Sequence, residues 1–120
     1  MDVQQLLWLF FGFSGRVNRA AYALAGLFLL LVQFFLVYRI AMTPEASTAN
    51  TFWGGIFLIA AGVALVSNIA LAVKRLHDFG KPGLIAILFV VAGVIMYLVL
   101  CFIPGDPGPN KYGQRTNAPR

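Results

Sequence analysis

Three long apolar blocks dominate the sequence. Residues 20–38, 52–73 and 84–103 contain no Asp, Glu, Lys, Arg or His. Each block has about 19 to 22 residues, and a helix that rises ~1.5 Å per residue would carry each one across a ~30 Å hydrocarbon core. A buried helix of a soluble domain needs neither that length nor that purity. The pattern predicts three transmembrane helices.

The two ends of the chain differ from the apolar blocks in length and composition. Residues 3–12 hold Trp8 and two adjacent phenylalanines but are too short to span a bilayer, so we expect a short helix lying in the membrane interface. Residues 104–120 are rich in Gly and Pro and predict turns followed by a flexible tail. The expected fold is therefore an all-α membrane protein, a single membrane domain over residues 1–120.

Composition supports this fold class. The chain is 60% hydrophobic and 11% charged, whereas soluble domains average about 45–50% and 25%. Its net charge of +5 does not predict nucleic-acid binding, because the basic residues flank the apolar blocks, where they set topology or meet anionic lipid. Cys101 is the single cysteine, so no intramolecular disulfide forms. No spacing of Cys and His predicts a metal, and no cofactor is expected.

Polar chemistry concentrates in "VKRLHDFGKPG", residues 73–83, after the second block. Cations at a helix C-terminus are favoured by ~0.3–1 kcal/mol, but Asp78 in the same place is opposed by the helix dipole and needs a cationic partner. Arg16 and Arg19 stand at the start of the first span, where positive charge is equally unfavourable. We therefore predict that Arg16 or Arg19 contacts Asp78 and joins the first two spans.

The same residues also suit an anion site for a lipid phosphate, with His77 as hydrogen-bond donor or proton carrier. Structural pairing is the preferred interpretation, because ionisable residues at the ends of spans are common. No catalytic residue is predicted: adjacent residues on a helix point apart, and no nucleophile motif is present, so an enzyme is not expected. The candidates for ion pairing or anion binding are Arg16, Arg19, Arg75, His77, Asp78 and Lys81.

Few polar residues lie inside the blocks. Gln33 is in the first, and Ser67 and Asn68 are in the second. We expect Gln33 and Asn68 to face neighbouring helices and to hydrogen-bond there.

Lys and Arg counts bear on orientation. Three spans leave five of these residues on the face that holds the N-terminus and four on the other, and those nearest the spans favour a cytoplasmic N-terminus. If residues 84–103 instead formed a re-entrant hairpin bent near Gly93, the tail would return to the first face and the count would become eight against one. A bent backbone at that depth needs burial in protein, hence an oligomer. The single span is preferred.

Three polar motifs together resemble a known family. The segments "FSGRVNRAAY", "KRLHDFGKPG" and "PGDPGPNKYG", separated by apolar blocks, are similar to the small bacterial inner-membrane family catalogued as domain of unknown function 805. The tail residues of this pattern are Gly105, Gly108, Asn110, Tyr112 and Gly113.

The chain departs from the family pattern at several positions. Relatives often carry an acid and a tryptophan where this chain has Ala21 and Ala23, and tryptophans where it has Leu84 and Ile85. Without an acid at position 21, Asp78 becomes the better partner for the arginines. The resemblance implies a multi-pass protein of the bacterial inner membrane without an established activity.

The function that we expect is a non-enzymatic membrane component. Its partners would be anionic lipid head groups, a second copy of the chain or other membrane proteins. The alternative is a small oligomeric transporter or channel. Only Gln33, Ser67 and Asn68 could supply its polar path, and that scarcity favours the first interpretation.

Overall fold

The fold is helical throughout the part of the chain that we describe. The computed structural model describes residues 2–119, and their side chains except those of residues 89 and 90. Within this range the only β-structure is two isolated bridges, which confirms the predicted all-α class. The elements are α1 (Val3–Phe11), α2 (Arg19–Ala41), α3 (Thr48–Asp78), the 3-10 helix η1 (Gly83–Ile87) and α4 (Leu88–Phe102).

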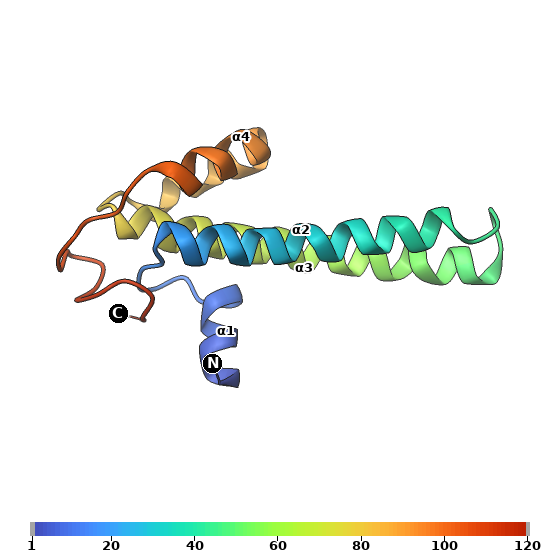
Figure 1. Ribbon diagram of the computed structural model, residues 1–120, viewed down its shortest axis with the longest axis horizontal. Coiled ribbons are helices and arrows are strands. Elements are labelled where there is room, and N and C mark those ends of the chain that lie inside the picture. Colours follow the sequence, from blue (N-terminus) through green and yellow to red (C-terminus); the bar gives the residue numbers. More distant parts are fainter. Residues whose placement is uncertain (1, 120) are drawn as a thin grey trace.

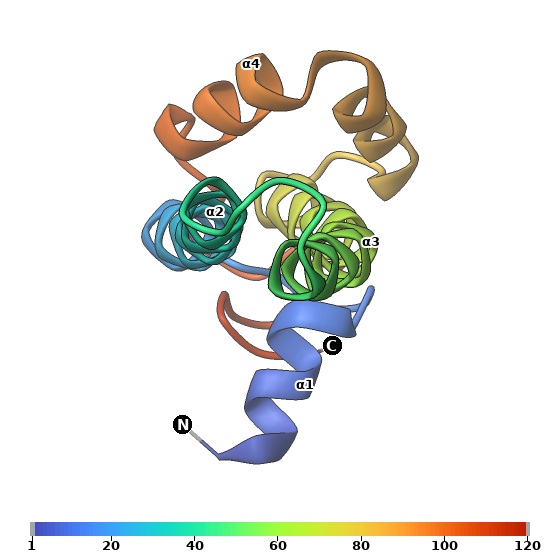
Figure 2. The ribbon, with the colours of Figure 1, turned by 90° about the vertical axis from the view of Figure 1, so that its right-hand side faces the viewer.

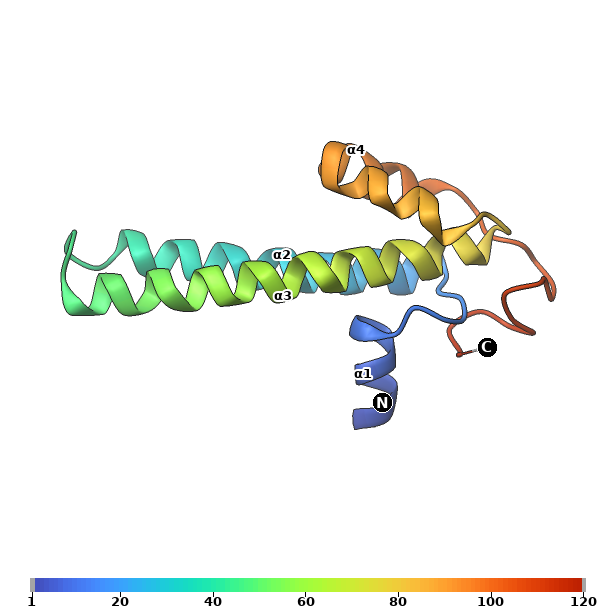
Figure 3. The same ribbon diagram turned by 180° about the vertical axis from the view of Figure 1, so that it is seen from behind.

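Helices α2 and α3 form a long antiparallel pair that runs the length of the molecule (Figures 1 and 3). Asn18 caps α2 by accepting a hydrogen bond from the Ala21 N–H, and Ser47 caps α3 by accepting one from Asn50. Their lengths are 23 and 31 residues. Within the described range, these two helices are long and apolar enough to cross a membrane, as predicted for the first two blocks.

The third block does not form one straight helix, and the predicted continuous span over 84–103 is wrong. It begins as the 3-10 helix η1, continues into α4, and breaks at Ala92, whose φ of −125° and ψ of 32° are not helical. Gly93, which follows, is a poor helix former. Figure 2 shows the chain rising to this bend and turning back on itself. Each arm is too short to cross a ~30 Å core alone.

The bend places the tail where the re-entrant alternative, and not the single span, would put it. Both arms lie beside the half of the α2–α3 pair that ends at Arg19 and Asp78 (Figure 1). Residues 104–119 then fold back over that end. The backbones of Arg16 and Ala118 form a β-bridge, and the Asn117 N–H donates to the Arg16 carbonyl at 2.7 Å. The tail is thus folded back and docked, which corrects both the expected flexible end and its expected position on the face opposite the N-terminus. Arg120 lies outside the described residues.

Helix α1 meets the α2–α3 pair at its C-terminal end and extends away from it, on the side opposite α4 (Figure 2). Asp2 and Gln5 form a capping box at its start, which satisfies two otherwise unpaired N–H groups. Its bounds, Val3–Phe11, agree with the helix predicted over 3–12. Its position in a membrane interface stays a prediction.

Tyr97 joins α4 to α2. Its hydroxyl donates to the Ala23 carbonyl at 2.7 Å, and its ring lies against Gly26. A Cβ added at Gly26 would lie 2.3 Å from Cε1 of Tyr97, so only glycine permits this approach. Tyr22 completes the junction as a nearby aromatic neighbour, with its ring centroid 5.4 Å from that of Tyr97.

The arrangement predicts that the tail and the segment before α2 are exposed on one side of the membrane. In a Cys101→Ser background, Ser14→Cys and Gln114→Cys should react with an impermeant maleimide from the same side of sealed vesicles, and Glu45→Cys only from the other. Labelling in detergent serves as the control for reactivity. Labelling of Gln114→Cys from the Glu45 side would contradict the bent arrangement.

Candidate functional site: a buried charged clasp and a cavity between α2, α3 and α4

Asp78, the last residue of α3, lies between two guanidinium groups. Arg16 Nε donates to Asp78 Oδ1 at 3.0 Å, and Arg75 Nη1 donates to Oδ2 at 2.9 Å. The three residues are at most 2% exposed. The Arg16–Asp78 contact is one of the two that the sequence predicts. We call Arg16, Arg75, Asp78 and the backbone carbonyls that they bind the charged clasp.

Arg16 uses all of its hydrogen-bonding capacity inside the protein. A guanidinium has five N–H donors. Besides its bond to the Asp78 carboxylate, Arg16 donates to four backbone carbonyls at 2.8–3.3 Å. These carbonyls belong to Asp78, Asp106, Gly108 and Gly113. Because three of the four lie in the tail, Arg16 is the residue around which the tail folds.

Arg75 holds the C-terminal end of α4. Its Nε donates to the Leu100 carbonyl at 2.8 Å, and Nη2 donates to the Ile103 carbonyl. The last carbonyls of a helix lack partners within the helix and carry partial negative charge, so a buried cation stabilises them. Arg75 therefore connects the returning arm of α4 to the end of α3.

Lys74 does the same for α1. Its ammonium donates to the carbonyls of Trp8 and Leu9 in the last turn of α1 and lies 4.6 Å from the centroid of the Trp8 ring. The Lys74 side chain is fully buried. Adjacent cations on α3 thus bind the C-terminal carbonyls of two different helices.

The tail fits closely over Asp78. The Asp106 N–H donates to the Asp78 carbonyl at 2.7 Å, and a Cβ added at Gly105 would lie 2.0 Å from Asp78 Oδ2. Gly108, in contrast, has nothing within 4 Å of such a Cβ. The glycine at 105 is therefore required by close approach to the carboxylate, and Gly108 contributes through its carbonyl.

His77 and Tyr112 form the second contact between α3 and the tail. Their rings stack with centroids 4.0 Å apart and an interplanar angle of 3°. His77 Nδ1 lies 3.0 Å from the Gly15 carbonyl, and Asn110 Nδ2 donates to the His77 carbonyl at 2.9 Å. The Tyr112 N–H donates to Asn110 Oδ1 and closes the turn, whose ends pair Asn110 with Gly113.

The structure divides the predicted site residues into two groups. Arg16, Arg75 and Asp78 meet in the clasp, and the tail residues pack over them. Arg19 and Lys81 are exposed and lie outside it, although Arg19 Nη1 reaches to 3.5 Å from the Phe102 carbonyl. Sequence reasoning missed the contact of Lys74 with α1, for which the only available signal was a lysine beside an arginine at a helix end.

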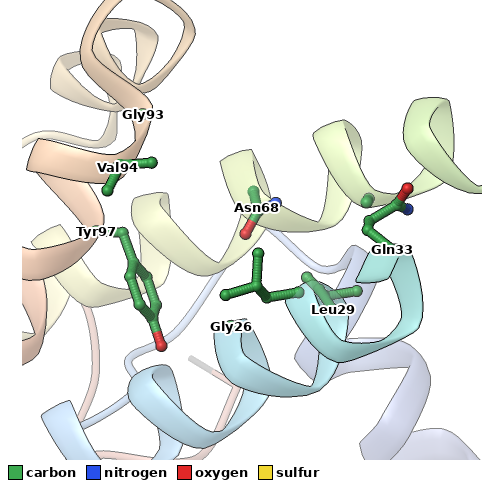
Figure 4. Close-up of a pocket in the computed structure, with 9 residues that line it drawn as sticks. Gly26, Leu29, Gln33, Asn68, Gly93, Val94 and Tyr97 are labelled. Atoms are coloured by element: carbon green, nitrogen blue, oxygen red, sulfur yellow. The ribbon is translucent and has the colours of Figure 1, made fainter. Parts of the chain in front are cut away.

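The polar residues inside the apolar blocks do not form the expected hydrogen bonds. Gln33 and Asn68 line a cavity of about 250 Å³ between α2, α3 and α4 (Figure 4). Within the described range, Gln33 Oε1 and Ser67 Oγ are buried without a hydrogen-bond partner. The expected interhelical hydrogen bond to Gln33 Oε1 is therefore absent there.

The chemistry of the clasp is suited to a structural role. Its carboxylate has one guanidinium on each oxygen, and every donor of Arg16 has an acceptor. Within residues 2–119, no three His, Cys, Asp or Glu side chains lie close enough together to hold a metal ion.

Comparison with known proteins gives one family. The sequence model of the family described as "Protein of unknown function (DUF805)" matches residues 10–114. The inner membrane protein YhaI of Escherichia coli strain K12 is 30% identical over 111 residues, which cover 85% of this chain and 83% of YhaI. YhaI of Escherichia coli O157:H7 matches to the same extent. No solved structure gives a significant match.

Removing the carboxylate charge should destabilise the protein strongly. Asp78→Asn leaves two buried guanidinium groups without a counter-charge, which costs about 3–5 kcal/mol of unfolding free energy. Asp106→Asn is the control, because Asp106 is exposed and binds Arg16 through its backbone. Unfolding in mixed micelles measures both variants, and equal stability of the two would contradict the clasp.

Exchanging the charges of the pair should not restore stability. In the double variant Arg16→Asp, Asp78→Arg, a carboxylate would face the carbonyls of Asp106, Gly108 and Gly113, which bind only donors. We expect the double variant to be no more stable than Arg16→Asp alone in the same unfolding experiment. Full rescue would show that the carbonyls do not matter.

Two glycines of the tail should differ in their tolerance of alanine. Gly105→Ala would force a methyl group into the Asp78 carboxylate and should cost about 1–3 kcal/mol. Gly108→Ala meets open space and should stay within about 0.5 kcal/mol of the parent. Limited proteolysis of the tail gives a second measurement, and similar cleavage of both variants would contradict the close fit.

Proposed function

This chain belongs to the family described as protein of unknown function (DUF805), and we propose that it is a non-enzymatic, multi-pass component of the bacterial inner membrane whose basic end binds anionic lipid. The observation that carries the proposal is the distribution of positive charge. The end of the molecule that holds the clasp, which we call the clasp end, carries nearly all of it.

The count at the two ends is strongly unequal. Of the nine Lys and Arg residues, Arg120 lies outside the described residues and Arg39 lies at the far end of α2, which leaves seven at the clasp end. Positive residues near membrane spans stay on the cytoplasmic side. We therefore propose that α2 and α3 cross the membrane, that η1 and α4 enter and leave from the cytoplasmic side, and that both ends of the chain are cytoplasmic.

The cations of the clasp end form a buried group and an exposed group. Arg16, Lys74 and Arg75 are buried and bind carbonyls, so they are not available to a lipid. The exposed cations are Arg19, Lys81, Lys111 and Arg115. Each Lys or Arg near an anionic surface contributes about 1 kcal/mol of attraction. Because the clasp holds the tail, it also places Lys111 and Arg115 beside the ends of α2 and α3.

Helix α1 supports the same orientation. It extends sideways from the α2–α3 pair toward the clasp end (Figure 1), and its exposed apolar side chains include Val3, Leu6 and Leu7. A helix that lies in the interface directs such side chains toward the acyl chains. The exposed cations would then lie at the level of the lipid phosphates.

Neutralising the exposed cations should remove a preference for anionic lipid. The parent is reconstituted in vesicles of phosphatidylglycerol and phosphatidylcholine and extracted with its surrounding lipid in polymer-bounded discs. We expect phosphatidylglycerol to be enriched several-fold around the parent, and to fall close to the bulk ratio around the variant Arg19→Gln, Lys81→Gln, Lys111→Gln, Arg115→Gln.

Arg39→Gln is the matched control, because it removes a cation from the far end and should leave the enrichment unchanged. High salt should weaken the enrichment around the parent, since exposed charges are screened. Undiminished enrichment around the fourfold variant would overturn the proposal.

A further inference from the structure

The cavity between α2, α3 and α4 lies at mid-depth of the α2–α3 pair. Gln33 is 14 residues beyond Arg19, and Asn68 is 10 residues before Asp78. At ~1.5 Å per residue, these amides lie roughly 21 and 15 Å from the clasp end of their helices. The hydrocarbon core is ~30 Å thick, so both amides belong to its interior.

The cavity exists because α4 bends. Gly93 and Val94, next to the break at Ala92, form one wall, and Gly26 and Leu29 of α2 form the opposite wall (Figure 4). A straight third helix would not turn back at this level. The bend therefore leaves a volume of about 250 Å³ next to two amide side chains.

The wall offers hydrogen bonds but no charge. Among the lining residues, the polar side chains are Gln33, Asn68 and Tyr97. The Tyr97 hydroxyl already donates to the Ala23 carbonyl, and Gln33 Oε1 is itself shielded from the cavity, whereas the half-buried Asn68 amide lines it. A polar group without a partner in hydrocarbon is unfavourable by several kcal/mol, so a ligand group that bonds to the Asn68 amide would be held firmly.

In the membrane orientation proposed above, on which this inference rests, the mouth of the cavity faces the surrounding lipid. Leu30 and Val94 line the cavity and are 45% and 75% exposed. A molecule that enters from this side must be soluble in the bilayer and uncharged, since no lining residue could neutralise a phosphate. It must also present a group that both donates to and accepts from an amide, as a hydroxyl does.

We propose that this cavity binds an uncharged lipid alcohol, with its hydroxyl on the Asn68 amide and its chain leaving past Leu30 and Val94. The volume holds the hydroxyl and the first part of one chain, not a whole lipid. This site is separate from the basic surface of the clasp end, and it involves none of the same residues.

Photocrosslinking tests the proposal. The full chain, in nanodiscs of phosphatidylcholine, is exposed to a diacylglycerol that carries a diazirine near its head group, and to a phosphatidylglycerol with the same chains. The diacylglycerol should label peptides containing Leu29, Leu30 or Val94 several-fold more than the phosphatidylglycerol does. Equal labelling of these peptides by both probes would overturn the proposal.

The double variant Gln33→Leu, Asn68→Leu keeps the apolar volume and removes both amides. It should reduce diacylglycerol labelling about tenfold, as expected for the loss of an ordinary hydrogen bond. Leu58→Ala is the control, because Leu58 is exposed on α3 and does not line the cavity. Labelling of the double variant at the level of the parent would refute the role of the amides.

A measurement on the parent alone covers the case in which the double variant does not fold. 1-Decanol should compete with the diacylglycerol probe, whereas decane at the same membrane concentration should not. Equal competition by both would show that the cavity takes any apolar chain, and would overturn the assignment of an alcohol.

Discussion

The fold at one end of this protein depends on a buried carboxylate held between two guanidinium groups. Asp78 ends α3, Arg16 precedes α2, and Arg75 lies one turn before Asp78. Removing these charges from water is expensive, and the expense is offset only when every donor and acceptor finds a partner. The tail supplies those partners through its carbonyls. The tail, the start of α2 and the end of α3 therefore depend on one another.

Backbone carbonyls are the second set of groups on which this end of the fold depends. Lys74 binds the end of α1, Arg75 binds the end of α4, and Arg16 binds the tail. Three buried cations thus each hold a different segment of the chain against the α2–α3 pair. The exposed cations depend on them in turn, because Lys111 and Arg115 are carried by a tail whose position Arg16 sets. The basic surface that we propose to face lipid rests on this buried layer.

Much of the architecture could be predicted from the sequence. The first two apolar blocks became α2 and α3, and the helix dipole argument paired Asp78 with Arg16 or Arg19, of which Arg16 is the partner. The bend at Ala92 was harder to predict, because a straight and a bent segment of 20 apolar residues have the same composition and length. Alanine and glycine there permit the break without requiring it.

The carbonyls of the clasp and the cavity beside Gln33 posed a different difficulty. Every residue has a backbone carbonyl, so the sequence does not show which carbonyls accept from Arg16 before the position of the tail is known. The cavity follows from the bend, and it could be predicted no better than the bend itself. The motif residues Gly105, Asn110 and Tyr112 were visible in advance, but their contacts with Asp78 and His77 depend on which way the tail returns.

The return of α4 has a consequence for how the chain is made. In the orientation that we propose, both arms of the bend stay at the clasp end, so only the short connection between α2 and α3 is carried to the far end. In that orientation the α2–α3 pair can enter a bilayer as one hairpin while synthesis continues. Arg16 and Arg75 are made before residues 100–113, whose carbonyls complete their hydrogen bonds. Until those residues leave the ribosome, both guanidinium groups must stay hydrated, and the final packing of this end waits for the last part of the chain.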